Sequence, residues 1–92
     1  MLMIDASQIK AARALLNMSQ TDLARIASVH VATVRRIEAS TEVRGAAETL
    51  WKIQSALEKA GIEFIPADEQ RGRGLRFRNI PRGRQRSKRS TP

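Results

Sequence analysis

Apolar residues recur at helical spacing near the start of the chain, and they predict a helix over about residues 6–16. The positions expected to face inward are Ile9, Ala12, Leu15 and Leu16. The start of this helix has two candidate caps, Asp5 and Ser7. Asp5 together with Gln8 also has the spacing of a capping box, in which each residue bonds the other's backbone N–H.

The segment that begins at Ser19, SQTDLARIASVHVATVRRIE, contains two short amphipathic stretches. They predict helices over about residues 20–27 and 31–38, with Ser19 as the N-cap of the first. A tight turn at Ser28 and Val29 joins them, with Val29 buried. The inner stripes consist of Leu23, Ala24, Ala27, Val34 and Ile37. The outward-pointing residues of the second helix are Val31, Ala32, Thr33, Arg35 and Arg36.

A polar loop, ASTEVRG, follows and ends at Gly45. The next apolar stripe predicts a helix over about residues 46–60, and Gly61 is well placed to end it. This stripe consists of Leu50, Ile53, Leu57 and Ala60.

Two short strands are predicted after this helix. Residues 62–65 (IEFI) form the first, which Pro66 stops, and residues 75–78 (LRFR) alternate apolar and basic side chains as a half-buried strand does. The polar residues 67–74 suit a hairpin loop. From Pro81 onward the chain has no apolar side chain that could build a core, so we expect disorder there.

These elements resemble the lambda-repressor/Cro-like (Xre-type) helix-turn-helix family over roughly residues 5–80. The matching residues are Ser19-Gln20, Leu23-Ala24, Ala27, Val29, Thr33-Val34 and Ile37-Glu38, preceded by the first helix and Asn17-Met18. Two positions depart from the family pattern: Ser28 stands where glycine is usual, and His30 where serine or threonine is usual. A small polar residue can adopt the backbone angles of such a turn at modest cost.

The resemblance implies a mainly α fold: a four-helix lambda-repressor-like DNA-binding domain followed by a short β-hairpin and a disordered basic tail. We therefore divide the chain into a DNA-binding domain (1–61), a hairpin extension that could mediate dimerisation (62–80) and the tail (81–92). Ninety-two residues provide for one small core.

The resemblance also implies that residues 31–38 enter the DNA major groove. The implied base contacts are Val31, Ala32, Thr33, Arg35 and Arg36. An arginine such as Arg36 can bond a guanine through two hydrogen bonds, while Val31 and Ala32 can touch thymine methyl groups. Arg35 can reach a base edge or a phosphate, and so can Thr33; the alternative for the arginines is an ordinary solvated face.

Six further residues are candidates for phosphate contact: Gln20, His30, Arg44, Arg82, Arg84 and Arg86. Gln20 opens a helix, where the helix dipole favours an anion. His30 can either cap the helix that follows it or touch a phosphate. Arg44 lies in the loop after residues 31–38, where a solvated side chain is the competing interpretation.

Arg13 and Glu38 match two positions that form a buried ion pair in repressors of this family. Such a pair would hold the recognition helix against the first helix, and it would be structural rather than catalytic. The alternative is that both side chains face solvent.

The net charge of +8 is unevenly distributed along the chain. Residues 1–69 hold eight Lys/Arg and nine Asp/Glu, whereas residues 70–92 hold nine Lys/Arg and no acidic residue. A basic arm beside a helix-turn-helix indicates phosphate contact. An acidic protein partner, or a merely solubilising terminus, would also account for it.

A two-fold dimer is expected, because one helix-turn-helix contacts few base pairs. The candidate interface residues are Trp51, Phe64 and Phe77. Trp51 lies one residue off the apolar stripe of its helix, so it either packs beneath the hairpin or projects into a dimer interface. The alternative for the hairpin is a monomeric arrangement packed on the helix at 46–60.

The composition points away from catalysis. The chain has no cysteine, no tyrosine and one histidine, and its acidic residues are scattered. We expect no enzymatic activity, no metal site and no cofactor. No apolar run is long enough for a membrane span and no signal peptide is evident, so we expect a cytoplasmic, nucleoid-associated protein.

Three functions remain in view. The first is a dimeric, sequence-specific transcriptional regulator, most simply a repressor of the kind that the resemblance associates with phages and mobile elements. The second is an antitoxin whose residues 70–92 wrap a toxin and order on binding; an anti-regulator protein is a similar possible partner. The third is a non-specific nucleic-acid-binding protein driven by the arginine-rich tail.

Overall fold

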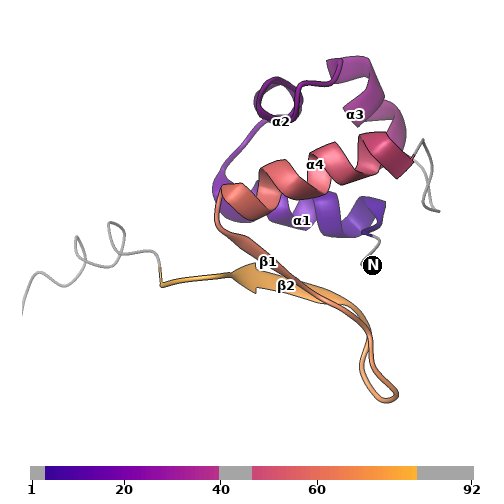
Figure 1. The fold of residues 1–92 in the computed structure, drawn as a ribbon, viewed down its shortest axis with the longest axis vertical. Coiled ribbons are helices and arrows are strands. Elements are labelled where there is room, and N and C mark those ends of the chain that lie inside the picture. The colour runs from indigo at the N-terminus through magenta and orange to yellow at the C-terminus, as the bar shows by residue number, and fades with distance from the viewer. Residues whose placement is uncertain (1–3, 40–46, 81–92) are drawn as a thin grey trace, which may run out of the picture.

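The computed structural model describes residues 4–39 and 47–80, and there the chain forms four helices followed by an antiparallel hairpin (Figure 1). In chain order the elements are α1 (Ala6–Leu16), α2 (Gln20–Ala27), α3 (Val31–Glu38), α4 (Ala47–Lys59), β1 (Ile62–Ile65) and β2 (Gly74–Phe77). This order confirms the predicted fold class. The predicted disorder of residues 81–92 lies outside the described residues.

The first two helices begin with capping boxes and end with the same left-handed turn. Asp5 caps α1 with Gln8 as its reciprocal partner, and Ser19 caps α2 in the same way with Asp22. At the other ends, Asn17 (φ +54°) and Ser28 (φ +59°) are left-handed, and the N–H of the next residue bonds back across the last turn. This closing bond satisfies a terminal carbonyl and reverses the chain sharply.

The core lies between the four helices and the inner face of the hairpin. Its largest fully buried side chains are Ile4, Ile9, Leu23, Val34, Ile37, Ile53, Leu57 and Ile62. Ile4, which precedes α1 and was not predicted as a core residue, is 1% exposed. Val29, predicted to be buried, is half-buried and packs against the core.

Two residues predicted to face inward are exposed instead. Leu15 is 37% exposed, because the buried face of α1 is centred between Ile9 and Ala12, and the helical repeat places Leu15 about 90° from that centre. Ala60 follows the last residue of α4 and lies in the turn toward β1, so it leaves the helix face that Leu57 continues.

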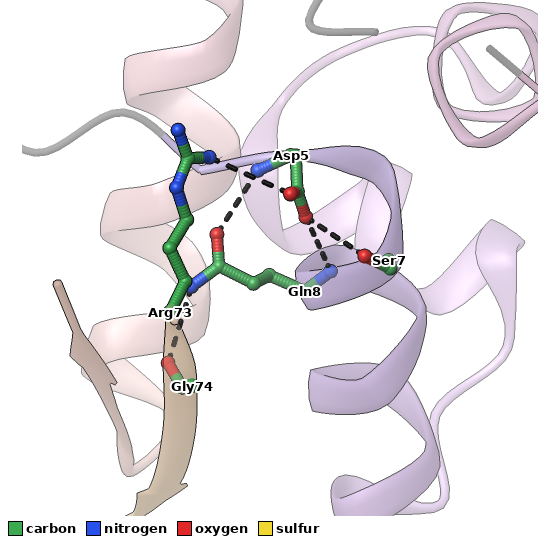
Figure 2. Close-up of polar contacts among 5 residues, drawn as sticks. All are labelled: Asp5, Ser7, Gln8, Arg73 and Gly74. Atoms are coloured by element: carbon green, nitrogen blue, oxygen red, sulfur yellow. Dashed lines mark hydrogen bonds and ion pairs between the residues drawn. The ribbon is translucent and has the colours of Figure 1, made fainter. Parts of the chain in front are cut away.

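The hairpin is held to the start of α1 (Figure 2). Gln8 is 4% exposed, and its Nε2 donates to the carbonyl oxygen of Gly74 at 3.1 Å, while its Oε1 accepts from the N–H of Asp5. Arg73 adds an ion pair to Asp5 at 3.5 Å. The residues that cap α1 therefore also anchor β2, which fixes the hairpin on the helical body.

The two strands pair in a register that puts Ile62 opposite Phe77 and Phe64 opposite Leu75. The turn from α4 into β1 uses Gly61 at φ +113°, a conformation that side chains rarely adopt. The guanidinium of Arg78 donates to the carbonyl oxygens of Glu58 and Ile62, which ties the exit of β2 to the end of α4. Among the described helices, none has both the length and the apolar character needed to cross a membrane.

Candidate nucleic-acid interface

The turn between α2 and α3 sets the orientation of α3 relative to α2. The left-handed Ser28 ends α2, and the N–H of Val29 bonds the carbonyl oxygen of Ala24 at 3.0 Å. Ala24 is 5% exposed and Leu23 is fully buried, so α2 packs closely against the rest of the domain. The result is two short helices joined by a tight turn, as the sequence predicts.

One face of α3 is buried and the other is exposed. Val34, Ile37 and Glu38 are each at most 4% exposed, which fixes the helix on the core. The exposed side presents three of the predicted base-reading residues, namely Ala32, Arg35 and Arg36. The face of α3 that is open to solvent is therefore basic, because it carries Arg35 and Arg36.

The other two predicted base-reading residues are less open than the sequence suggests. Val31 and Thr33 are half-buried, and Val31 packs against the core. Val31 lies three residues before Val34, so the helical repeat keeps it beside the buried stripe. The sequence predicts that both side chains point outward, but in the structure each is only partly exposed.

His30 caps the N-terminus of α3. Its Nδ1 accepts a hydrogen bond from the N–H of Ala32 at 3.1 Å. An accepting Nδ1 carries no proton, so the neutral ring carries its proton on Nε2, a hydrogen-bond donor at an exposed position. Of the two roles considered for His30, the structure contains the cap, and the cap does not prevent the second role.

Arg13 and Glu38 form the ion pair that holds α1 to the end of α3. The Arg13 Nε and Nη2 atoms lie 2.7 Å from the two Glu38 carboxylate oxygens, a bidentate arrangement. Arg13 is 21% exposed and Glu38 only 4%. Arg13 also donates through Nη1 to the carbonyl oxygen of Met18 at 3.0 Å. The same guanidinium therefore also holds the segment that joins α1 to α2.

Burial alone would raise the pKa of Glu38, but hydrogen bonds from Arg13 and Gln20 and the positive charge of Arg13 outweigh it and hold this pKa below its ordinary value. The hydrogen bond from Glu38 raises the pKa of Arg13 in turn. The pair therefore stays ionised near neutral pH, and no charge is left without a partner in this buried position.

Gln20 has a contact that the sequence did not predict. Its Nε2 donates to Glu38 Oε1 at 3.1 Å, so the carboxylate at the end of α3 also orients the first residue of α2. A side-chain amide has two N–H donors, and this bond uses one. The partners are 18 positions apart, and no local pattern in the sequence links them.

Several predicted contact residues lie outside the described residues: Arg44, Arg82, Arg84 and Arg86. Of the three predicted interface residues, Trp51 is 57% exposed on α4, and it lies beside α2 rather than beneath the hairpin. Phe64 is 6% exposed and belongs to the core, so it offers almost no surface to a partner. Phe77 is half-buried at the end of β2.

Over residues 4–39 and 47–80, no group of three or more histidine or acidic side chains is arranged to hold a metal ion. The exposed arginines of α3, Arg35 and Arg36, suit an anionic partner.

Comparison with known families gives one finding. Residues 9–64 match a family model described as Helix-turn-helix, and the match runs from within α1 through most of β1. A comparison with curated proteins gives no match.

Proposed function

The chain belongs to the lambda-repressor-like (Xre-type) helix-turn-helix family, and from this premise we propose that it is a dimeric repressor that binds an inverted-repeat operator. That it is a DNA-binding regulator of the Xre type follows from the family itself. The proposal concerns how it reads DNA, in what assembly, and with what effect on transcription.

The observation that carries the proposal is the division of α3 into a buried and an exposed face. Val34, Ile37 and the Arg13–Glu38 pair hold one side of the helix rigidly on the core. A helix fixed in this way can enter a major groove with little loss of conformational freedom. The exposed Arg36 is then available to bond the O6 and N7 atoms of a guanine.

Neighbouring residues support a role in positioning the backbone of the DNA. Gln20 lies at the N-terminus of α2, where the unpaired N–H groups and the dipole of the helix favour a phosphate. Its amide is oriented by Glu38 and keeps a second N–H for such a contact. His30 presents its Nε2 donor at the start of α3, and we assign it to a second phosphate.

The hairpin is the element that we assign to dimerisation. Within the described residues, β1 and β2 pair with no other strand, and a two-stranded hairpin of this kind can be extended by a strand of a second copy. Phe77 is half-buried at one end of the hairpin, and Ile80, 68% exposed, follows it. Operator binding by such a dimer requires that the two-fold contact presents the two α3 helices to successive turns of the DNA, about 34 Å apart.

Selection of bound fragments from a genomic DNA library tests this proposal. Full-length protein and a variant that ends at residue 80 are used side by side. A shared inverted-repeat motif, with half-sites one helical turn apart, is the expected result. If neither protein enriches a motif, the proposal of sequence-specific reading fails, and non-specific binding through the arginine-rich tail replaces it.

A promoter–reporter assay on the selected operator then tests repression. We expect reporter output to fall when the protein is supplied, and to recover when the operator is scrambled. A rise in output would show activation and would contradict the repressor assignment.

A further inference from the structure

An open hollow lies between the C-terminal end of α2 and the part of α4 that runs from Trp51 to its last residue, Lys59. We call it the α2–α4 hollow, and its volume is about 270 Å³. Small residues form its floor, since Ala27 and Ala56 are buried where the two helices meet. Ile26 and Trp51 form its apolar walls, and Lys52 and Lys59 lie at its rim.

The two apolar walls of the hollow are open to solvent. Trp51 is 57% exposed and Ile26 is 41% exposed, and the two belong to one hollow although they come from different helices. Scattered exposed apolar residues are ordinary, but a tryptophan and an isoleucine gathered on one surface are typical of a site that a partner covers.

The charges at the rim have a single sign. Among the residues that the structure describes, the charged side chains that line the α2–α4 hollow are Lys52 and Lys59, and both are exposed. They lie on the same face of α4 as Ser55, at the spacing of successive helical turns. The surface therefore combines an apolar floor and walls with a cationic border.

The charge decides which occupant fits. A second copy docked face to face by two-fold symmetry would bring its own Lys52 and Lys59 against these two, which like-charge repulsion disfavours. The basic segment 81–92 of this chain is disfavoured for the same reason. A small molecule would stay largely uncovered, because the hollow is smaller than typical ligand pockets and open to solvent.

We propose that the α2–α4 hollow docks an acidic, amphipathic segment of another protein. Apolar side chains of that segment pack between Ile26 and Trp51, and its carboxylates bond Lys52 and Lys59. A helix with apolar residues at positions i, i+3, i+4 and i+7 and glutamates beside them has the required pattern. This replaces the prediction that Trp51 lies in a dimer interface, and it does not depend on the operator or on the dimer proposed above.

Trp51 itself reports on the binding, because it is the only tryptophan of the chain. The probe is a synthetic helical peptide with a leucine stripe flanked by glutamates, added to the full-length protein. We expect a saturable blue shift of the Trp51 emission as the indole leaves water. A matched peptide with lysine in place of each glutamate should give no shift.

A third peptide, with the glutamates but without the leucines, controls for attraction to the basic tail. It can bind residues 81–92, but it should leave the emission of Trp51 unchanged. An emission shift with this peptide equal to that of the full probe would overturn the assignment of the apolar walls.

Substitutions distinguish peptide binding that depends on the lysines of the hollow from binding that depends on the net charge of the whole protein. The Lys52→Glu/Lys59→Glu double variant should bind the glutamate–leucine peptide at least about tenfold more weakly. The matched control, Lys10→Glu/Arg71→Glu, replaces two exposed basic residues on α1 and in the hairpin loop, makes the same change in net charge and should bind as the native protein does. Ile26→Ser, followed through the same emission, removes an apolar wall without changing charge and should also weaken binding. Thermal unfolding by circular dichroism checks that each variant is folded.

Three results would overturn the proposal. The first is no emission shift with the glutamate–leucine peptide, and the second is an equal shift with the lysine peptide. The third is an emission shift that follows protein concentration without peptide, together with a dimeric mass, because this would assign the hollow to a second copy.

Discussion

Replacing Arg13 with methionine tests whether the ion pair between α1 and α3 is as buried as its geometry indicates. Methionine keeps much of the apolar stem but removes the guanidinium. The substitution deletes two bonds of 2.7 Å to Glu38 and one of 3.0 Å to the Met18 carbonyl oxygen. Among the contacts between described residues, Glu38, 4% exposed, then keeps its bond from Gln20.

The size of the loss follows from these contacts. Hydrogen bonds to charged groups contribute about 1.5–3 kcal/mol each, and breaking a buried pair costs roughly 3–5 kcal/mol. We expect Arg13→Met to lower the free energy of unfolding by about 4 kcal/mol. Glu38→Met should cost less, about 2 kcal/mol, because Arg13 at 21% exposure can be hydrated.

Replacing both partners should cost less than the two single changes together, because no buried charge is then left unpaired. We expect the Arg13→Met/Glu38→Met protein to lose only about 2 kcal/mol. Urea unfolding followed by circular dichroism measures all four proteins, and the cycle gives the coupling between the two residues. A fully additive double variant would mean that the side chains do not interact in solution.

The dependence on pH gives an independent signature. In the native protein the pKa of Glu38 lies below its ordinary value, so its contribution is complete above that ordinary value and is lost only as the pH falls through the lowered one. In Arg13→Met, burial without the guanidinium should raise the pKa of Glu38. The variant should then gain stability as the pH falls from 7 toward 5, where the native protein changes little through this group. A penalty below about 1 kcal/mol that does not vary with pH would refute the reasoning.

Three further predictions concern the turn, the cap and the tail. Ser28→Gly should raise the free energy of unfolding by about 0.5 kcal/mol, because relief of the left-handed strain at φ +59° exceeds the entropy that glycine loses on folding. Urea unfolding measures this change, and a destabilised variant would contradict it. His30→Ala should lower the free energy of unfolding by about 1 kcal/mol, because it removes the cap of α3. His30→Ser, which restores a cap, should stay close to the native protein in thermal unfolding. Equal losses in the two variants would contradict the assignment of the loss to the cap. Removing residues 81–92, which hold five Lys/Arg, should flatten the slope of log affinity for DNA against log salt concentration by up to about 4.5. An unchanged slope in a fluorescence-anisotropy titration would exclude phosphate contact by the tail.

Local patterns in the sequence were sufficient to predict the helices, their caps and the turn. Asp5, Ser19 and Gly61 each act on the residues next to them, so the signal for a helix end lies within a few positions. The pairing of Arg13 with Glu38 came from the family resemblance rather than from spacing, since 25 positions separate them.

Contacts between distant elements could not be predicted in this way. Gln8 bonds Gly74 across 66 positions and Gln20 bonds Glu38 across 18. No periodic pattern of residues in the sequence indicates either contact. The exposure of Leu15 and the burial of Phe64 were misjudged for a related reason. Both depend on where the hairpin and the other helices pack, which hydrophobicity along one element does not specify.

The most direct test of the central claim is to repeat the DNA selection with Arg36→Ala and compare its motif with that of the native protein. If the exposed face of α3 reads bases, the variant should lose preference at one position in each half-site. Its affinity for the native operator should fall by roughly 1–3 kcal/mol, while Arg71→Ala in the hairpin loop leaves the motif unchanged. An unaltered motif, or an equal loss on scrambled DNA, would contradict the assignment of α3 as the reading element.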